Sequence, residues 1–242
     1  MKSLSKILAV LVVFSFMFVV TAHAAQYSRI INDPHTGTTI IKNEPPANST
    51  PELTQQQLLD KVMFIAKDFD GVTYGQFNLD FEIEGGQAEL VRLFFVTLRA
   101  KGISHAVIEI TSPGGEVAEA LKMKAYIEEY QNHGMLVTTK IYCFSASAAS
   151  FLFLAANDRQ INPEAIIMFH EIEQPTYMSM QSPSVKEDEA GISRFIQDDL
   201  NEYIASRCKL SKDQMDQLVY KRELWINGRI ALQLGIATSF IK

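Results

Sequence analysis

Two hydrophobic periods alternate along the chain from residue 61 to its end. Short continuous apolar runs at residues 105–111, 136–144 and 165–169 are typical of buried strands. Residues 88–100 instead carry apolar side chains at the three- and four-residue spacing of a helix, and Gly102 follows them. Because strand and helix patterns take turns, the sequence predicts an α/β domain with largely parallel strands.

The same patterns place the remaining elements of this domain. We expect further strands at residues 62–69 and 73–83, and further helices at residues 116–132, 146–156, 184–207, 211–219 and 229–234. The helix at residues 184–207 is the longest of them and carries a polar face.

The first 24 residues follow the pattern of a secretory signal peptide. Lys2 and Lys6 precede an apolar run at residues 7–20, and residues 22–24 (Ala-His-Ala) supply small residues at the two positions that a signal peptidase reads. The run has 14 residues, whereas a membrane-spanning helix needs about 20. We therefore expect cleavage after Ala24 and export to the periplasm or the medium, with an uncleaved membrane anchor as the alternative.

Residues 25–60 are expected to lie outside the main domain, which the patterns place at residues 61–242. Turn-forming residues at positions 32–37 separate two isoleucine pairs, at positions 30–31 and 40–41, and this arrangement predicts a small hairpin. Three prolines between positions 43 and 51 indicate a linker.

Composition narrows the possible classes of function. The chain has 242 residues, of which 47% are hydrophobic and 21% charged, so a folded globular protein is expected. The net charge of −6 argues against broad nucleic-acid binding, which needs clustered basic residues. Two cysteines exclude a four-cysteine zinc site. Cys143 lies in an apolar run, which favours a buried free thiol, and a Cys143–Cys208 disulfide is the alternative.

Three predicted strand ends carry residues suited to chemistry, and reacting groups in α/β sheets collect at the carboxyl ends of the strands. Residues 112–115 (Ser-Pro-Gly-Gly) follow one strand, and their glycines allow backbone N–H groups to turn toward a ligand. Residues 145–150 follow a second strand and contain three serines. His170 ends the third strand and has the side chain most often used as a general base. Taken singly, each segment has an ordinary structural explanation as a turn, a capped helix or a core histidine.

Taken together and in this order, these segments resemble the proteolytic subunit of Clp protease, within the Clp/crotonase superfamily. Residues 112–115 match the family's S-P-G-G loop. Residues 146–151 (A-S-A-A-S-F) match a stretch of phage-type members whose last serine is the nucleophile. Residues 162–170 resemble the A-P-N-A-x-x-M-I-H of those members, and residues 222–227 resemble the family's R-D-x-F/W-L-[ST]. The resemblance covers about residues 62–241.

This resemblance implies the site residues of a serine peptidase. Ser150 would attack the peptide carbonyl, and His170 would take the hydroxyl proton and later donate it to the leaving amine. The loop of Gly114 and Gly115 would form the oxyanion hole, in which the N–H groups of Gly115 and Phe151 hold the tetrahedral oxyanion.

The acid that orients the histidine is less regular in this sequence. The family has an aspartate at the position of Glu223, two residues before an aromatic residue, so Glu223 is expected to complete the triad. Asp213 and Asp216, on a predicted helix nearby, are the alternatives.

The resemblance also implies a fold and a set of partners. The fold would be an α/β superhelix of β-β-α units with a protruding handle helix, here residues 184–207. Assembly as a homo-oligomer is implied, with a peptide or unfolded protein as substrate and with no cofactor or metal. Because a signal peptide would separate the chain from ATP-driven unfoldases, we expect no stable ATPase partner and a peptidase that works without ATP.

Two other functions fit the same fold. The first is a catalytically silent protein that binds peptides or serves as a scaffold. The second is a crotonase-type enzyme that would use the loop of Gly114 and Gly115 on an acyl thioester. Export argues against this function, because coenzyme A substrates are cytoplasmic. Labelling by a fluorophosphonate distinguishes the silent protein from the peptidase.

Overall fold

The computed structural model describes residues 27–32, 39–44, 54–172 and 183–241. The chain divides into two units, residues 1–53 and residues 54–242. In the first unit, β1 (Tyr27–Asn32) and β2 (Thr39–Glu44) form an antiparallel pair in which Ile31 lies opposite Ile40, so the predicted hairpin is confirmed. The predicted signal peptide at residues 1–24 lies outside the described residues. Within the described ranges, no helix is both long and apolar enough to cross a membrane.

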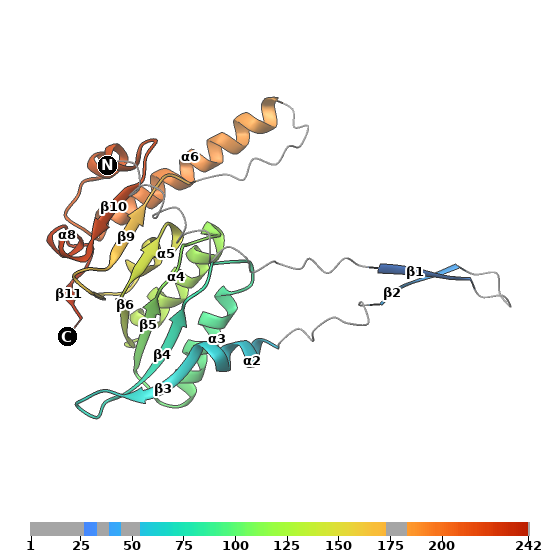
Figure 1. The fold of residues 1–242 in the computed structure, drawn as a ribbon, viewed down its shortest axis with the longest axis horizontal. Coiled ribbons are helices and arrows are strands. Elements are labelled where there is room, and N and C mark those ends of the chain that lie inside the picture. The colour runs from blue at the N-terminus through green and yellow to red at the C-terminus, as the bar shows by residue number, and fades with distance from the viewer. Residues whose placement is uncertain (1–26, 33–38, 45–53, 173–182, 242) are drawn as a thin grey trace, which may run out of the picture. The chain divides into compact units, whose positions relative to one another are not determined.

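A six-stranded sheet forms the centre of the second unit (Figure 1). Its strand order is β11-β8-β6-β5-β4-β3, and only the β3–β4 pair is antiparallel, so the prediction of a largely parallel sheet is confirmed. The strands are β3 (Met63–Lys67), β4 (Thr73–Leu79), β5 (His105–Ile110), β6 (Leu136–Ile141), β8 (Asp158–Ile161) and β11 (Ser239–Phe240).

A second sheet of three strands lies beside the first, and two of the three strand ends singled out in the sequence, at residues 145–150 and at His170, belong to it. Its order is β10-β9-β7, with β7 (Phe144–Ala146) parallel to β9 (Ile166–Phe169) and β10 (Leu224–Asn227) antiparallel to it. The single strand expected at residues 136–144 is therefore two strands, because the chain leaves the first sheet after Ile141 and enters the second at Phe144.

Cys143 lies at this crossing between the sheets. It is exposed, which corrects the expectation that it is buried, because the backbone there belongs to neither sheet. Both Cys143 and Cys208 are free thiols, so the alternative of a disulfide between them is wrong in this structure.

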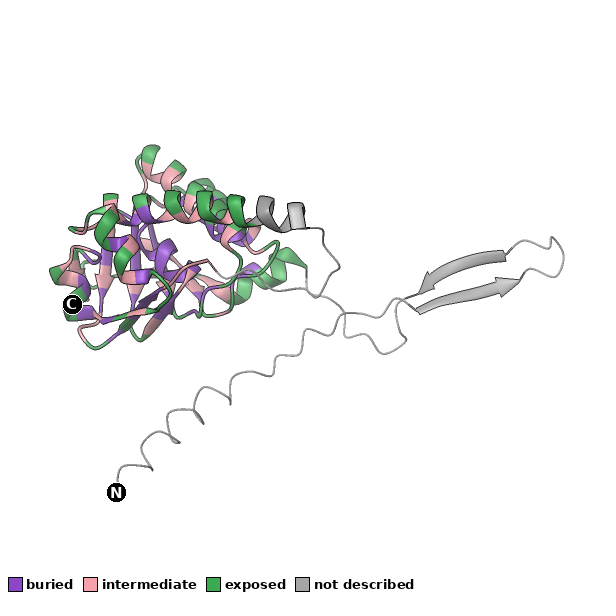
Figure 2. Ribbon diagram, turned by 90° about the horizontal axis from the view of Figure 1, so that it is seen from above, coloured by how far each residue is buried: buried purple, intermediate pink, exposed green. Residues whose placement is uncertain are grey.

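Helices pack against the sheets and enclose the hydrophobic core (Figure 2). Helix α3 (Ala88–Ala100) buries Leu90, Phe94 and Leu98, the apolar stripe recognised in the sequence. Helices α4 (Val117–Asn132) and α5 (Ala148–Phe153) contribute Met123 and Phe153 to the same core. The domain therefore has the layered α/β architecture that was predicted.

The main domain begins earlier than its predicted start at residue 61. Helix α2 (Gln55–Val62) starts at a capping box formed by Thr54 and Gln57, and Leu59 is fully buried in the core. The unit consequently includes residues 54–60, which the sequence patterns had assigned to the peripheral segment.

The long helix α6 (Pro183–Ser206) has 24 residues and projects from the body of the domain (Figure 1). Its described outer part exposes Ile192 and Phe195. Two short helices follow, α7 (Lys212–Val219) and α8 (Gly228–Gln233). The protruding helix expected at residues 184–207 is thus present with nearly the same bounds.

Arg159 fastens the end of the chain to the core. Its side chain is buried, and its guanidinium donates hydrogen bonds to backbone carbonyls of Ala156, Arg207, Gly235 and Ile236, at 2.7–3.2 Å. A planar group with five N–H donors suits several carbonyl acceptors at once. The bonds therefore join β8 to the segments that precede α7 and follow α8.

We predict that Arg159→Met lowers the free energy of unfolding by about 3 kcal/mol or more, because it leaves several buried carbonyl groups without a donor. The matched control is Arg229→Met, which removes an exposed ion pair with Glu164 and should cost at most about 1 kcal/mol. Urea denaturation of both variants measures the difference. Equal losses in the two variants would contradict the role given to Arg159.

Candidate active site

Ser147 occupies a sharp turn between β7 and α5. Its backbone has φ 54° and ψ −127°, a left-handed conformation that a residue with a Cβ rarely adopts. The Ser147 N–H donates to the Met168 carbonyl at 2.9 Å, and this bond holds the turn against strand β9. Strained backbone of this kind is concentrated at functional sites, and it is the conformation of a nucleophile elbow.

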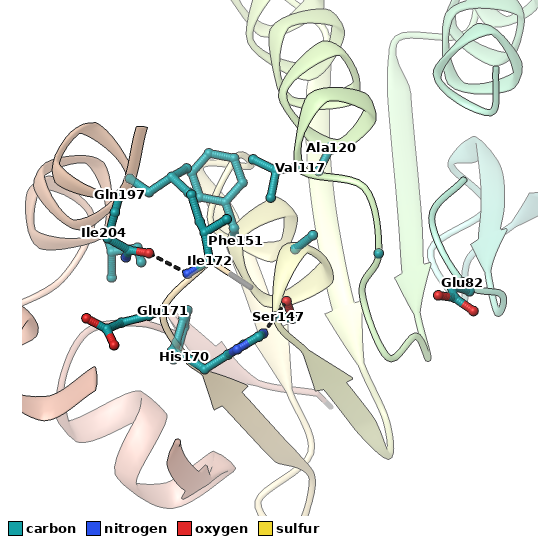
Figure 3. A pocket seen from close by; sticks show the side chains of 14 residues that line it. Glu82, Val117, Ala120, Ser147, Phe151, His170, Glu171, Ile172, Gln197 and Ile204 are labelled. Atoms are coloured by element: carbon teal, nitrogen blue, oxygen red, sulfur yellow. Dashed lines mark hydrogen bonds between the residues drawn. The ribbon is translucent and has the colours of Figure 1, made fainter. Parts of the chain in front are cut away.

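His170 lies directly beside this serine. Its Nε2 atom is 2.7 Å from the Ser147 Oγ atom, as the dashed line in Figure 3 shows. The pairing of β7 with β9 sets Ala146 opposite Met168, so Ser147 and His170 both come just after the carboxyl ends of adjacent parallel strands. Both side chains are half-buried, which leaves one side of the pair accessible.

Ser150, the nucleophile expected from the sequence, is not at this position. Its side chain is fully buried, and its Oγ atom donates to the Ser145 Oγ atom at 3.4 Å. The prediction that Ser150 pairs with His170 is therefore wrong by one helical turn. Ser150 lies within α5, on the face that packs into the core, whereas Ser147 lies just before the first helical residue.

The Gly114–Gly115 loop packs closely against Ile83 and against residues 146–148. Gly114 has φ 98° and Gly115 has φ 140°, values that favour glycine. Ile83 N–H donates to the Gly114 carbonyl at 2.7 Å, and Glu116 N–H donates to the Ile83 carbonyl at 2.8 Å. A Cβ on Gly115 would lie 2.1 Å from the Ile83 oxygen, so only glycine fits here.

One of the two expected oxyanion donors is already bonded within the protein. Gly114 N–H donates to the Ser112 Oγ atom at 3.2 Å, and Phe151 N–H donates to the Ser147 carbonyl at 3.2 Å within the helix. The Phe151 N–H, which was expected to hold the oxyanion together with the Gly115 N–H, is thus engaged within the helix, so this part of the expectation is not met. Gly115 and Ala148 line the cleft together with Ser147.

A buried carboxylate supports this corner of the site. Glu119 accepts a hydrogen bond from the Ala88 N–H at 3.0 Å, at the start of α3, and forms an ion pair with Lys122. The hydrogen bond from Lys122 lowers the pKa of Glu119 below its usual value, so the carboxylate is charged at neutral pH. Glu119, on α4, therefore holds the start of α3. These two helices follow the two residues of the Ile83–Gly115 bridge in the chain.

The Ser147–His170 pair opens into a cleft of about 390 Å³ (Figure 3). One wall is apolar and is formed by Val117, Ala120, Phe151, Leu200 and Ile204. Polar groups border the cleft elsewhere, among them Glu82, Glu171 and Gln197. Ile172 N–H donates to the Gln197 Oε1 atom at 2.6 Å, which ties the segment after His170 to the projecting helix α6.

Glu223, the expected orienting acid, is not among the residues that line the cleft, and its carboxylate is bonded elsewhere. It comes just before β10, and its Oε2 atom accepts a hydrogen bond from the indole Nε1 of Trp225 at 2.7 Å.

The alternative Asp216 accepts hydrogen bonds from Asn201 and Lys212. Burial acts to raise the pKa of Asp216, but these two bonds outweigh it and lower the pKa. The other alternative, Asp213, is exposed on the first turn of α7.

Comparison with known proteins places the chain in a family. The family model described as Clp protease matches residues 75–242, and the protein therefore belongs to the Clp protease family. The fold and the resemblance expected from the sequence are thereby confirmed. A search of curated proteins gives no match to this chain.

Of the residues that line this cleft, the sequence had singled out His170 and Gly115 as site residues but not Ser147 and Ala148. Ser147 and Ser150 stand three residues apart in a run of small residues, so the choice between them depended on where the helix begins. The Ser112–Ser145 bridge and the β7–β9 register decide this, and both are contacts between distant parts of the chain.

We predict that Ser147→Gly is more stable than Ser147→Ala by about 1 kcal/mol. Both variants lack the hydroxyl, but glycine relieves a positive-φ strain of about 1–3 kcal/mol, offset in part by the larger entropy of glycine in the unfolded chain. Chemical denaturation of the two variants gives the difference in the free energy of unfolding.

Ser150 supplies the matched control for this measurement. It lies inside a helix, so Ser150→Gly should be less stable than Ser150→Ala by about 1 kcal/mol, the opposite sign. If alanine were favoured equally at both positions, Ser147 would carry no backbone strain.

Proposed function

We propose that this protein is an exported serine endopeptidase in which Ser147 is the nucleophile and His170 is the general base. The observation that carries the proposal is the 2.7 Å contact between His170 Nε2 and Ser147 Oγ at the mouth of a cleft. Membership of the Clp protease family supports peptidase chemistry in general. The strained turn at Ser147 supports the choice of this serine.

The chemistry follows from the positions of these groups. Ser147 Oγ attacks the carbonyl carbon of the scissile peptide bond, while His170 Nε2 takes the hydroxyl proton. The peptide C–N bond then breaks as His170 donates this proton to the departing amine, which leaves an acyl ester on Ser147. A water molecule, deprotonated by His170, then attacks the ester carbonyl, the bond from the acyl carbon to Ser147 Oγ breaks, and His170 returns the proton to Ser147 Oγ as the second product leaves.

Backbone N–H groups stabilise the oxyanion that forms during each attack. The N–H of Ala148, the residue after the nucleophile, and the N–H of Gly115, from the neighbouring loop, are the donors we assign. Donors of this kind each contribute about 3–4 kcal/mol to lowering the barrier. The apolar wall with Phe151, Leu200 and Ile204 accommodates a side chain of the bound peptide.

We further propose that the enzyme acts outside the cytoplasm, on short or unfolded chains and without an ATPase partner. The basic and apolar start of the sequence and its Ala-His-Ala site support export. Clp protease family members are typically oligomeric and act on peptides, and the projecting helix α6, with exposed Ile192 and Phe195, supports a homo-oligomer.

Reaction with a fluorophosphonate tests the nucleophile. We predict that the wild-type protein and Ser150→Ala are labelled, whereas Ser147→Ala is not labelled and loses peptide hydrolysis by about a thousandfold or more. Mass spectrometry of the labelled peptide identifies the modified serine, and thermal unfolding checks that each variant is folded. Labelling at Ser150, or full activity of Ser147→Ala, would refute the assignment. A folded wild-type protein that neither labels nor hydrolyses peptides would indicate a silent scaffold.

Intact mass of the protein recovered from the exported fraction tests localisation. Cleavage after Ala24 predicts a mature chain that begins at Ala25. A mass that retains residues 1–24, in protein that sediments with membranes, would show an anchored enzyme.

A further inference from the structure

The inference concerns the charges that border the cleft, and it rests on the proposed function of Ser147 and His170. Glu82 and Glu171 line the cleft together with this pair. Among the described residues that line the cleft, there is no lysine and no arginine. A substrate that enters therefore meets two carboxylates that no basic side chain of this lining offsets.

The two carboxylates come from different chain segments, on either side of the Ser147–His170 pair. Glu82 directly precedes Ile83, the residue that bridges to the glycine loop. Glu171 directly follows His170. In the view of Figure 3, Ser147 and His170 lie between the two glutamates. A peptide that reaches Ser147 therefore passes a carboxylate on each side of the reacting bond.

Within the part of the chain that the structure describes, neither carboxylate forms an ion pair. Glu82 is exposed. Glu171 accepts the backbone N–H of Lys221 at 2.9 Å, which uses one of its two oxygens, while the Lys221 ammonium lies 5.0 Å from the centre of the Tyr220 ring. Tyr220 and, to a smaller extent, the charge of Glu171 raise the pKa of Lys221. This cation therefore partly offsets Glu171, and Glu82 makes the larger contribution to the negative border.

The apolar wall of the cleft has the opposite character. Phe151 and Ile204 are each 5% exposed, and the Phe151 ring packs against Tyr203 with 4.8 Å between the ring centroids. Leu200 precedes Ile204 by four residues on α6, so both side chains lie on the same face of this helix. A wall of this kind binds an apolar side chain, whereas a charged one would lose its hydration there without a partner.

We propose that the cleft selects cationic amphipathic peptides, with Glu82 and Glu171 as specificity-determining residues. An apolar side chain of the substrate packs against the wall, and basic side chains of the adjacent residues reach the two carboxylates. Successive side chains of an extended peptide point in opposite directions, about 3.3 Å apart along the chain, so the neighbours of an apolar residue on the wall point toward the border. One charge pair about 4 Å apart in water corresponds to about a fivefold change in affinity.

The test uses three fluorogenic peptides with a central leucine, in which both neighbours of the leucine are arginine, citrulline or glutamate. Citrulline has the shape of arginine without its charge. For the wild-type protein at low salt, we expect kcat/KM to be about tenfold higher for the arginine peptide than for the citrulline peptide, and lowest for the glutamate peptide. Addition of about 0.5 M NaCl should reduce the tenfold preference to about threefold or less, because salt screens charges that are exposed to solvent.

Glu82→Gln and Glu171→Gln remove the charges and keep the size of the side chains. Glutamine also keeps an oxygen that can accept the Lys221 N–H. We expect the double variant to prefer the arginine peptide by about twofold or less, with the larger single effect from Glu82→Gln. The matched control is Glu129→Gln, at the exposed end of α4 away from the cleft. It makes the same change to the net charge of −6 and should keep the full preference.

Binding separates this inference from the peptidase assignment. Fluorescence anisotropy gives the Kd of each peptide for Ser147→Ala, which should bind without cleaving, and we expect the arginine peptide to bind most tightly and the glutamate peptide most weakly. If the wild type hydrolyses none of the three peptides, the peptidase assignment fails, and the order of the Kd values still decides the specificity.

Two results would overturn the inference while the peptidase assignment stands. One is an equal kcat/KM of the wild type for the arginine and citrulline peptides. The other is a preference that the double variant Glu82→Gln/Glu171→Gln keeps in full, or that Glu129→Gln loses to the same extent, because the preference would then reflect the overall charge of the protein.

Discussion

The parallel pairing of β7 with β9 is the constraint on which the site depends. It sets Ala146 opposite Met168, and the next backbone bond, from Ser147 N–H to the Met168 carbonyl, turns the chain into α5. One ladder therefore positions both the serine and the histidine. Because these bonds are made by backbone atoms, the 2.7 Å contact between the two side chains is built into the sheet and does not rely on side-chain packing alone.

The rest of the site is organised around backbone approaches that large side chains would prevent. Gly115 lies against Ile83, and Gly114 lies against residues 146–148, where an added Cβ would be 2.7–2.9 Å from its neighbours. These contacts lock the glycine loop to the serine turn. The small residues of both segments thus have a single physical role, which is to let three chain segments meet within contact distance.

Glu223, the expected orienting acid, is held by weaker forces. Glu223 and Trp225 are exposed, and exposed hydrogen bonds exchange readily with water and with other partners. The histidine and the serine are held by a sheet, whereas the carboxylate is held by one side-chain contact. In the proposed site, the serine and the histidine are therefore fixed by backbone pairing, whereas Glu223 is not.

Local sequence determined the elements of this protein. The hairpin at Ile31 and Ile40 follows from a cluster of turn-forming residues, and the helices α3 and α6 follow from helical patterns. Both signals depend on neighbouring residues alone. His170 and Gly115 could also be found, because a histidine that ends an apolar strand and a paired-glycine turn are local signals.

Tertiary structure decided which serine meets His170, where Cys143 lies and how Glu223 is directed. Ser147 and Ser150 have similar local surroundings, and the pairing of β7 with β9, together with the Ser112–Ser145 bridge, determines which of them precedes the helix. The exposure of Cys143 depends on the chain crossing between two sheets, and the direction of Glu223 depends on an indole two residues away. Local propensity cannot predict these features. The position of the serine and the exposure of Cys143 depend on contacts between segments that lie twenty residues or more apart in the sequence. The direction of Glu223 depends on a choice between side-chain rotamers of similar local energy.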